Sequence, residues 1–154
     1  MPTHYDGTEE EKRVLDAYIK LMRASDTITA RLNELRAHGG LSVSQFGTLE
    51  ALYHLGPLYQ KDIGEKILKS GGNITMVIDN LESKGYVERR RDAEDRRYVV
   101  VHLTETGKTE IENILPQHVE YIVDMLNVLT PEEQERLGKL CRKLGRGVVN
   151  QKES

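Results

Sequence analysis

The sequence contains no tryptophan, and only one cysteine and one phenylalanine, among its 154 residues. The single cysteine, Cys141, cannot form a disulfide within the chain, which excludes a disulfide scaffold and fits a reducing compartment. No apolar run approaches the ~20 residues that a membrane-spanning helix requires. The first residues are acidic and polar, unlike a signal peptide. These absences predict a cytoplasmic protein that has no membrane partner.

Sequence motifs for catalysis and for metal binding are also missing. There is no paired-carboxylate motif, no Ser-His arrangement and no glycine-rich phosphate loop. The five histidines are scattered, and none pairs at the i, i+4 spacing of metal-ligating helices. We therefore expect a protein that is not an enzyme and that has no cofactor or metal.

Positive charge is concentrated in one stretch of the chain. The formal net charge is -3, so the molecule as a whole does not attract nucleic acid, and any affinity for DNA must come from a local basic patch. One stretch provides such a patch, and its basic residues are Lys84, Arg89, Arg90, Arg91, Arg96 and Arg97.

The segment SGGNITMVIDNLESK, residues 70–84, predicts a helix with two unlike faces. Apolar residues recur at i, i+3, i+4 and i+7, which predicts a buried stripe formed by Ile74, Val77, Ile78 and Leu81. The other face carries short polar groups that can hydrogen-bond to base edges. With the preceding apolar run 63–68 and two glycines, this outlines a helix-turn-helix over about 60–84. On this segment alone, an ordinary amphipathic helix of an all-α protein is an equal alternative.

The periodicity changes to two after Gly85. Residues 86–89 and 98–103 are rich in β-branched and aromatic side chains, and the polar loop RRDAED lies between them. This pattern predicts a β-hairpin over about 86–103 that carries arginines at its tip.

Capping motifs predict the remaining helices. Thr8 and Ser42 each begin a capping box, Thr104 can cap another helix, and Thr130 precedes a proline and a glutamate at N3. The first helix should run to about Arg36 and end with a left-handed glycine at 39 or 40. Pro116 should kink the helix that follows Thr104.

The first and last helices carry more apolar surface than a small domain can cover. We therefore expect residues of about 8–37 and 105–149 to form a dimerisation region. The predicted fold is mainly α (α+β), with a winged helix-turn-helix between these terminal helices.

The segment DRRYVVVHLTETG, residues 95–107, resembles the MarR family of bacterial winged-helix transcription regulators. SGGNITMVIDNLESKGYVER is similar to that family's recognition helix and first wing strand, and LSVSQFGTLEALYHLG also resembles the family. The resemblance spans nearly the whole chain and implies a MarR-type domain over residues 8–149. It implies a homodimer that binds a pseudo-palindromic operator in double-stranded DNA as a repressor, released by a small molecule or a thiol signal.

The resemblance also implies which residues contact DNA. Asp95 would orient Arg97 in the minor groove, where the potential is most negative, and Arg96 is the second candidate for insertion. Met76 stands where many relatives have a hydrogen-bonding residue, and Tyr59 where a short capping residue is common. The expected DNA-binding residues are Ser70, Asn73, Thr75, Met76, Asn80, Lys84, Arg89, Asp95, Arg96 and Arg97.

Family members bind phenolic compounds between the long helices and the winged domain, which implies a small aromatic or phenolic effector. Apolar walls with polar tips, suited to such a ligand, could come from Tyr18, Met22, Phe46, Tyr53 and His54. The alternative that these residues simply form core remains open.

Two further functions remain as alternatives. Cys141 lies in an apolar stripe, which predicts a buried and unreactive thiol, so a redox-sensing repressor is the weaker hypothesis. A winged-helix scaffold whose arginine hairpin meets an acidic protein is the rival from another functional class.

Overall fold

The structure of the chain is a computed structural model that describes residues 3–66 and 73–153. It contains two compact units, Met1–His118 and Val119–Ser154. The helix α5 (Glu105–Leu126) has residues in both units, and Pro116 lies within it.

The first unit begins with α1 (Glu9–Glu34), and the predicted capping box is confirmed. The Thr8 hydroxyl accepts a hydrogen bond from the Glu11 N–H, and the Glu11 carboxylate accepts one from the Thr8 N–H. The prediction of a glycine at the first left-handed position is wrong, because Arg36 takes that position with φ of 51°. Gly39 and Gly40 follow, and they also have positive φ.

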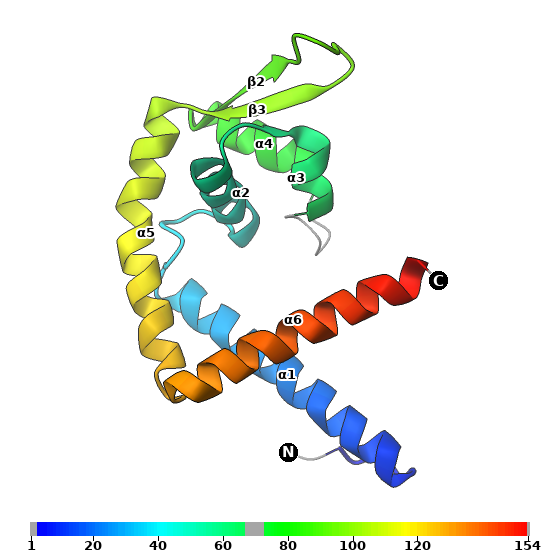
Figure 1. Cartoon of the computed structure of the whole chain (residues 1–154). Coiled ribbons are helices and arrows are strands. Elements are labelled where there is room, and N and C mark those ends of the chain that lie inside the picture. The colour runs from blue at the N-terminus through cyan, green and yellow to red at the C-terminus, as the bar shows by residue number, and fades with distance from the viewer. Residues whose placement is uncertain (1–2, 67–72, 154) are drawn as a thin grey trace. The chain divides into compact units, whose positions relative to one another are not determined.

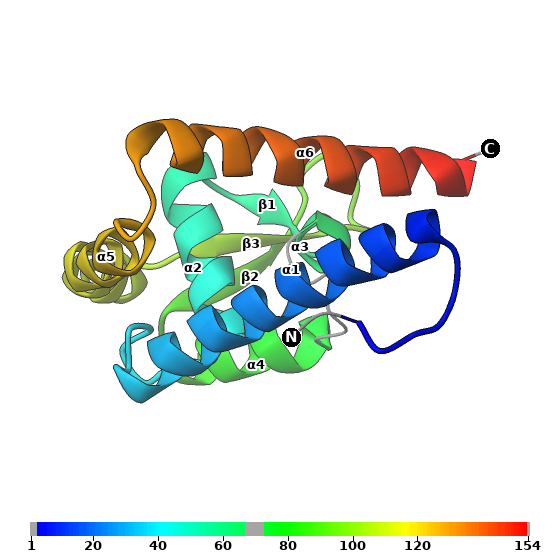
Figure 2. The same ribbon diagram turned by 90° about the horizontal axis from the view of Figure 1, so that it is seen from below.

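The winged part of this unit follows directly. Its elements are α2 (Val43–Leu55), β1 (Leu58–Tyr59), α3 (Gln60–Lys66), α4 (Ile74–Ser83), β2 (Val87–Arg91), β3 (Val99–Leu103) and the start of α5. The helices α2, α3 and α4 pack on the same face of the sheet (Figures 1 and 2). The capping box of Ser42 and Gln45 is confirmed at the start of α2.

The sheet has three antiparallel strands in the order β1-β3-β2. The hairpin predicted from the sequence is present as β2 and β3, with Val87 opposite Leu103. The prediction lacked the third strand, because β1 has only two residues and no alternation to detect. Leu58 of β1 lies opposite Val101 of β3. Because α3 follows β1 directly, this pairing connects the start of α3 to the wing.

The core confirms the predicted stripe of α4. Ile78 and Leu81 are fully buried and Val77 is nearly so, while Ile74 packs against the core from its edge. The stripe packs in one cluster with residues from the other elements of the unit, among them Leu49, Ile63, Val101 and Ile111. This burial holds α4 by one face and leaves the opposite face at the surface.

A buried aromatic group lies at the edge of the core. The rings of His38, Phe46 and His118 contact one another in a triangle, with centroid distances of 4.9 Å from His38 to Phe46, 4.4 Å from Phe46 to His118 and 5.3 Å between the two histidines. Burial first, and then the neighbouring His118, lower the pKa of His38 from 6.5, against an opposing effect of Glu50. The folded structure therefore favours the neutral form of His38.

Lowering the pH should reduce the free energy of unfolding through His38. Because its folded-state pKa lies below 6.5, the unfolded chain binds more protons at His38 than the folded chain between 6.5 and that lower pKa, so this part of the stability is lost as the pH falls through that window. Well above pH 6.5 the imidazole is neutral in both states, so no stability is lost through His38 there. Urea unfolding from about pH 7.5 to about pH 5 should show a smaller loss of stability in His38→Gln than in the wild type.

The control for this measurement is His54→Gln, since the side chain of His54 is exposed. Its stability should follow the wild-type pH dependence. Parallel curves for His38→Gln and the wild type would show that His38 does not link protonation to folding.

The second unit contains the end of α5 and the helix α6 (Pro131–Glu153). The Thr130 hydroxyl accepts from the Glu133 N–H and the Glu133 carboxylate accepts from the Thr130 N–H, so this capping motif is confirmed. The apolar residues of α6 lie at the surface of the chain, including Leu140 and Leu144. No helix in the described residues is both long and apolar enough to cross a membrane.

Candidate nucleic-acid interface

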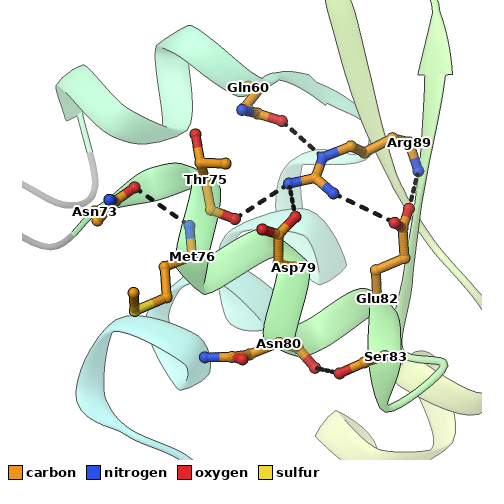
Figure 3. Close-up of polar contacts among 9 residues, drawn as sticks. All are labelled: Gln60, Asn73, Thr75, Met76, Asp79, Asn80, Glu82, Ser83 and Arg89. Atoms are coloured by element: carbon orange, nitrogen blue, oxygen red, sulfur yellow. Dashed lines mark hydrogen bonds and ion pairs between the residues drawn. The ribbon is translucent and has the colours of Figure 1, made fainter.

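The exposed face of α4 carries the side chains that the sequence assigned to base reading. Figure 3 shows Asn73, Thr75, Met76 and Asn80 along this helix. All four residues are exposed, and Met76 has 59% of its surface accessible. A row of amide, hydroxyl and thioether groups can meet base edges and thymine methyl groups in a major groove. Ser70, the other residue predicted in this region, lies outside the described residues.

Asn73 also has a structural role that the sequence analysis missed. It is the N-cap of α4, and its Oδ1 accepts a hydrogen bond of 3.2 Å from the Met76 N–H (Figure 3). The signal was available, because an asparagine directly before the first residue of an apolar periodicity is a common helix start.

Replacing Asn73 with alanine should therefore have two separable effects. Loss of the cap should lower the free energy of unfolding by about 1 kcal/mol. Loss of an amide contact to a base should lower discrimination of operator over random DNA by about 1–3 kcal/mol. Thermal melts and competition binding measure the two effects independently.

Two control variants separate these effects. Asn73→Ser restores the cap without the amide, so it should recover stability and not discrimination. Asn80→Ala, on the exposed part of the same helix, should lower discrimination and keep the cap. Wild-type discrimination in Asn73→Ser would mean that the Asn73 amide does not read bases.

The tip of the wing holds an arginine in a fixed position. Arg97 Nη2 lies 2.7 Å from Asp95 Oδ2, and Arg97 Nε donates to Asp95 Oδ1 at 3.0 Å. The Arg97 guanidinium, and then the Arg97 backbone N–H, lower the pKa of the Asp95 carboxyl. The Arg97 side chain is nevertheless 83% exposed, so the carboxylate orients the cation without covering it.

Tyr59 helps to shape this tip, which the sequence analysis did not predict. Its hydroxyl donates to Asp92 Oδ2 at 3.1 Å, and this bond raises the pKa of Tyr59. Its ring packs on Tyr98 with 5.5 Å between centroids, and the Lys61 ammonium lies 5.1 Å from the Tyr98 centroid. Through Tyr59, strand β1 thus contacts Asp92 and Tyr98, which lie on either side of the wing tip.

The remaining basic residues of the patch differ in how accessible they are. Lys84 is exposed at the C-cap of α4, and Arg96 is exposed at the tip. Arg90 is also exposed and pairs with Glu88 at 2.6 Å. Arg89 differs, because its side chain is only 23% exposed and its guanidinium contacts residues of the domain itself. The prediction grouped Arg89 with the DNA-contacting arginines, but its side chain faces α3 and α4 (Figure 3).

The sequence and the fold of the chain are similar to those of known proteins. Residues 41–99 match the model of the MarR family. The regulator MhqR of Bacillus subtilis, an HTH-type transcriptional regulator, is 35% identical over 87% of this chain and 92% of its own. The chain is a member of the MarR family.

Two solved structures place this MarR family member among regulators of similar fold. Sco3205 of Streptomyces coelicolor, a MarR family transcriptional regulator in complex with DNA, superposes with a TM-score of 0.77 and is 26% identical, covering 93% of this chain and 94% of its own. BpsR of Bordetella bronchiseptica, whose DNA binding is regulated by 6-hydroxynicotinic acid, superposes with a TM-score of 0.75 and is 25% identical, covering 84% of this chain and 98% of its own. The mainly α winged-helix fold predicted from the sequence is confirmed.

The five residues predicted to bind an effector differ in their environments in this MarR family member. Phe46 is buried in the core and contacts the rings of His38 and His118. Tyr18 and Met22 lie exposed on α1. Tyr53 is half-buried, its hydroxyl lies 3.4 Å from Glu112 Oε1, and the exposed His54 packs edge-on against its ring.

The environment of Cys141 differs from the prediction. The stripe on α6 was expected to bury the thiol, but Cys141 is exposed on the surface of the chain. The apolar side chains of α6 are exposed, because no described residue of the same unit packs over them. No group of three or more metal-ligating side chains occurs among the residues that the structure describes.

Proposed function

We propose that the protein is a homodimeric repressor that binds a pseudo-palindromic DNA operator and leaves it when a small aromatic or phenolic compound binds. The observation that carries the DNA-binding half of the proposal is the exposed Arg97 held by Asp95 at the wing tip. A narrow minor groove concentrates negative potential and favours such an arginine. The DNA complex of Sco3205 supports this use of the fold.

Each subunit would use two elements on DNA. The exposed face of α4, with Asn73, Thr75, Met76 and Asn80, would enter the major groove and read bases. Arg97 would enter the adjacent minor groove, with Arg96 as the second candidate for insertion, and Lys84 would contact a phosphate. Ser70, which lies outside the described residues, is proposed as a further DNA contact.

The apolar residues at the surface of the terminal helices support a dimer. On α1 these include Val14 and Tyr18, which are more than half exposed, and on α6 they include Leu140 and Leu144. A monomeric protein seldom exposes so much apolar surface to solvent. Two recognition helices about 34 Å apart, or a multiple of that, could then enter successive major grooves. Sedimentation velocity should show a dimer, and a stable monomer at micromolar concentration would remove the basis for a palindromic operator.

The effector half of the proposal concerns the five residues Tyr18, Met22, Phe46, Tyr53 and His54. The regulation of BpsR by 6-hydroxynicotinic acid supports an aromatic ligand class. Such a ligand must favour the conformation that does not bind the operator, and it needs about 5 kcal/mol of differential affinity to release most of the protein.

A release assay tests the effector half. Phenols, quinones and aromatic carboxylates should displace the protein from operator DNA equally in the wild type and in Cys141→Ser. Tyr53→Ala should blunt the response, and Tyr53→Phe, which keeps the ring, separates the aromatic wall from the hydroxyl that contacts Glu112.

The exposed thiol of Cys141 makes a redox-sensing repressor the second candidate. The same assay distinguishes it. If Cys141→Ser abolishes release by quinones or peroxides while reversible phenols affect neither protein, the thiol is the sensor and the proposed pocket is wrong.

A further inference from the structure

Arg89 is surrounded by more polar partners than any other arginine in the wing. Its Nε donates to Gln60 Oε1 at 3.0 Å, and its Nη1 lies 3.3 Å from Glu82 Oε1. Its Nη2 donates to the Thr75 carbonyl oxygen at 3.1 Å and pairs with Asp79 Oδ1 at 2.7 Å (Figure 3). These four contacts involve all three guanidinium nitrogens, which carry five N–H donors in a rigid fork.

The contacts join three elements through one side chain. Arg89 belongs to β2, Gln60 begins α3, and the other three partners lie on α4. Thr75, Asp79 and Glu82 are spaced at i, i+4 and i+7, so they follow one side of α4 for two turns. Glu82 also accepts a hydrogen bond of 3.1 Å from the Arg89 backbone N–H.

This side of α4 is not its buried stripe, and it borders the reading face at Thr75, whose backbone carbonyl and not its side chain accepts from Arg89. The core holds the helix along Val77, Ile78 and Leu81. A stripe of apolar contacts is non-directional and leaves small rotations and slides inexpensive. Directional bonds from Arg89 to three positions spread over two turns of α4 restrict both motions and fix the helix relative to the wing.

The acidic residues of this group are otherwise hard to explain on a DNA-facing helix. Asp79 is 57% exposed and Glu82 is 43% exposed. Carboxylates near phosphates weaken DNA binding, and the single positive charge of Arg89 leaves a net negative charge on the group. Holding a guanidinium in position gives these carboxylates a role that offsets this cost.

We propose that Arg89 is a positioning residue that sets the orientation of α4 against the wing through Asp79 and Glu82, and that it determines sequence discrimination without contacting DNA. The inference rests on the proposed DNA-binding function. It gives Arg89 a different role from Arg97, although both are arginines of the same wing.

The test compares affinities for the selected operator duplex and for a random duplex. Arg89→Lys keeps the charge and loses the fork, so affinity for random DNA should stay within about 2-fold while the operator preference falls on the order of 10-fold or more. Arg89→Ala should lose the same preference, and the salt slope for operator binding should stay at its wild-type value because no phosphate contact is removed.

Two further variants sharpen the comparison. Arg90→Ala removes the same charge from the same strand and should leave the operator preference within about 2-fold of the wild type. Asp79→Asn removes a negative charge from the helix, so it should raise affinity for random DNA and still lower the preference. Because Asp79 acts through Arg89, the double variant Asp79→Asn/Arg89→Ala should be no less selective than Arg89→Ala alone.

Several outcomes would overturn the proposal. Equal losses on both duplexes, with a salt slope reduced by about one for each arginine removed, would make Arg89 a phosphate contact. An unchanged preference for the operator over random DNA in Arg89→Lys and Asp79→Asn, each verified as folded by thermal melting, would show that Arg89 has no role in discrimination. A wild-type protein without any preference would overturn the proposed function itself, and this is measured before any variant.

Discussion

Replacing Arg97 with alanine is expected to weaken operator binding on the order of 10-fold per subunit, and hence on the order of 100-fold for a dimer. The reason is that Arg97 is the exposed cation that Asp95 holds at the wing tip. The slope of log affinity against log salt concentration should fall by about one for each arginine removed. Fluorescence anisotropy of a labelled operator over a salt series measures both quantities.

Asp95→Ala provides the more discriminating variant. It removes a negative charge from the wing, which by general electrostatics should strengthen DNA binding. If Asp95 orients Arg97, the variant should instead weaken operator binding in part. Arg31→Ala removes a positive charge from α1, as Arg97→Ala does from the wing. It should have little effect on operator affinity or on the salt slope. Wild-type affinity in both Arg97→Ala and Asp95→Ala would mean that the hairpin does not act as a DNA wing.

The largest expected effect on stability is that of Gly107→Ala. Gly107 is buried at the start of α5, and a Cβ added there would lie 2.1 Å from the Tyr86 carbonyl oxygen and 2.8 Å from Leu103 Cδ1. The Tyr86 carbonyl cannot easily move, because it accepts the Thr104 N–H at 3.1 Å. Overpacking of this kind should cost about 2–3 kcal/mol, which corresponds to a fall in melting temperature of roughly 5–10 °C.

Gly138→Ala is the matched control for this measurement. Gly138 lies inside α6, and its added Cβ would meet nothing within 4 Å. The change should therefore raise stability by about 0.5–1 kcal/mol, as expected for alanine in a helix interior. Equal melting temperatures for Gly107→Ala and the wild type would show that α5 does not start in close contact with the strand before it.

The parts of the fold that the sequence predicted depend on local chemistry. The capping boxes at Thr8 and Ser42 join residues three positions apart, and the stripe of α4 repeats within two turns. Such patterns can be read without knowing the rest of the chain. The strand β1 could not be read, because its two residues pair with Val100 and Val101, more than forty positions away.

The same difference applies to the candidate site. Asp95 and Arg97 are two positions apart, and a known family motif indicated their pairing. The side chain of Arg89 contacts Gln60, 29 positions away, and residues of α4 between 7 and 14 positions away. Periodicity in a sequence does not indicate contacts at such separations, so all the arginines of the basic patch looked equivalent. The structure shows that Arg89 is largely buried by its polar partners, whereas Arg96 and Arg97 are exposed.

Selection of bound duplexes from a random DNA pool tests the central claim most directly. If the dimer reads DNA through α4 and the wing, the enriched sequences should contain two inverted half-sites whose centres lie about 34 Å apart or a multiple of that. The same selection with Asn80→Ala should relax the preference within each half-site and keep the spacing. No enrichment by the wild-type protein would contradict the account and favour a winged-helix scaffold that binds an acidic protein partner.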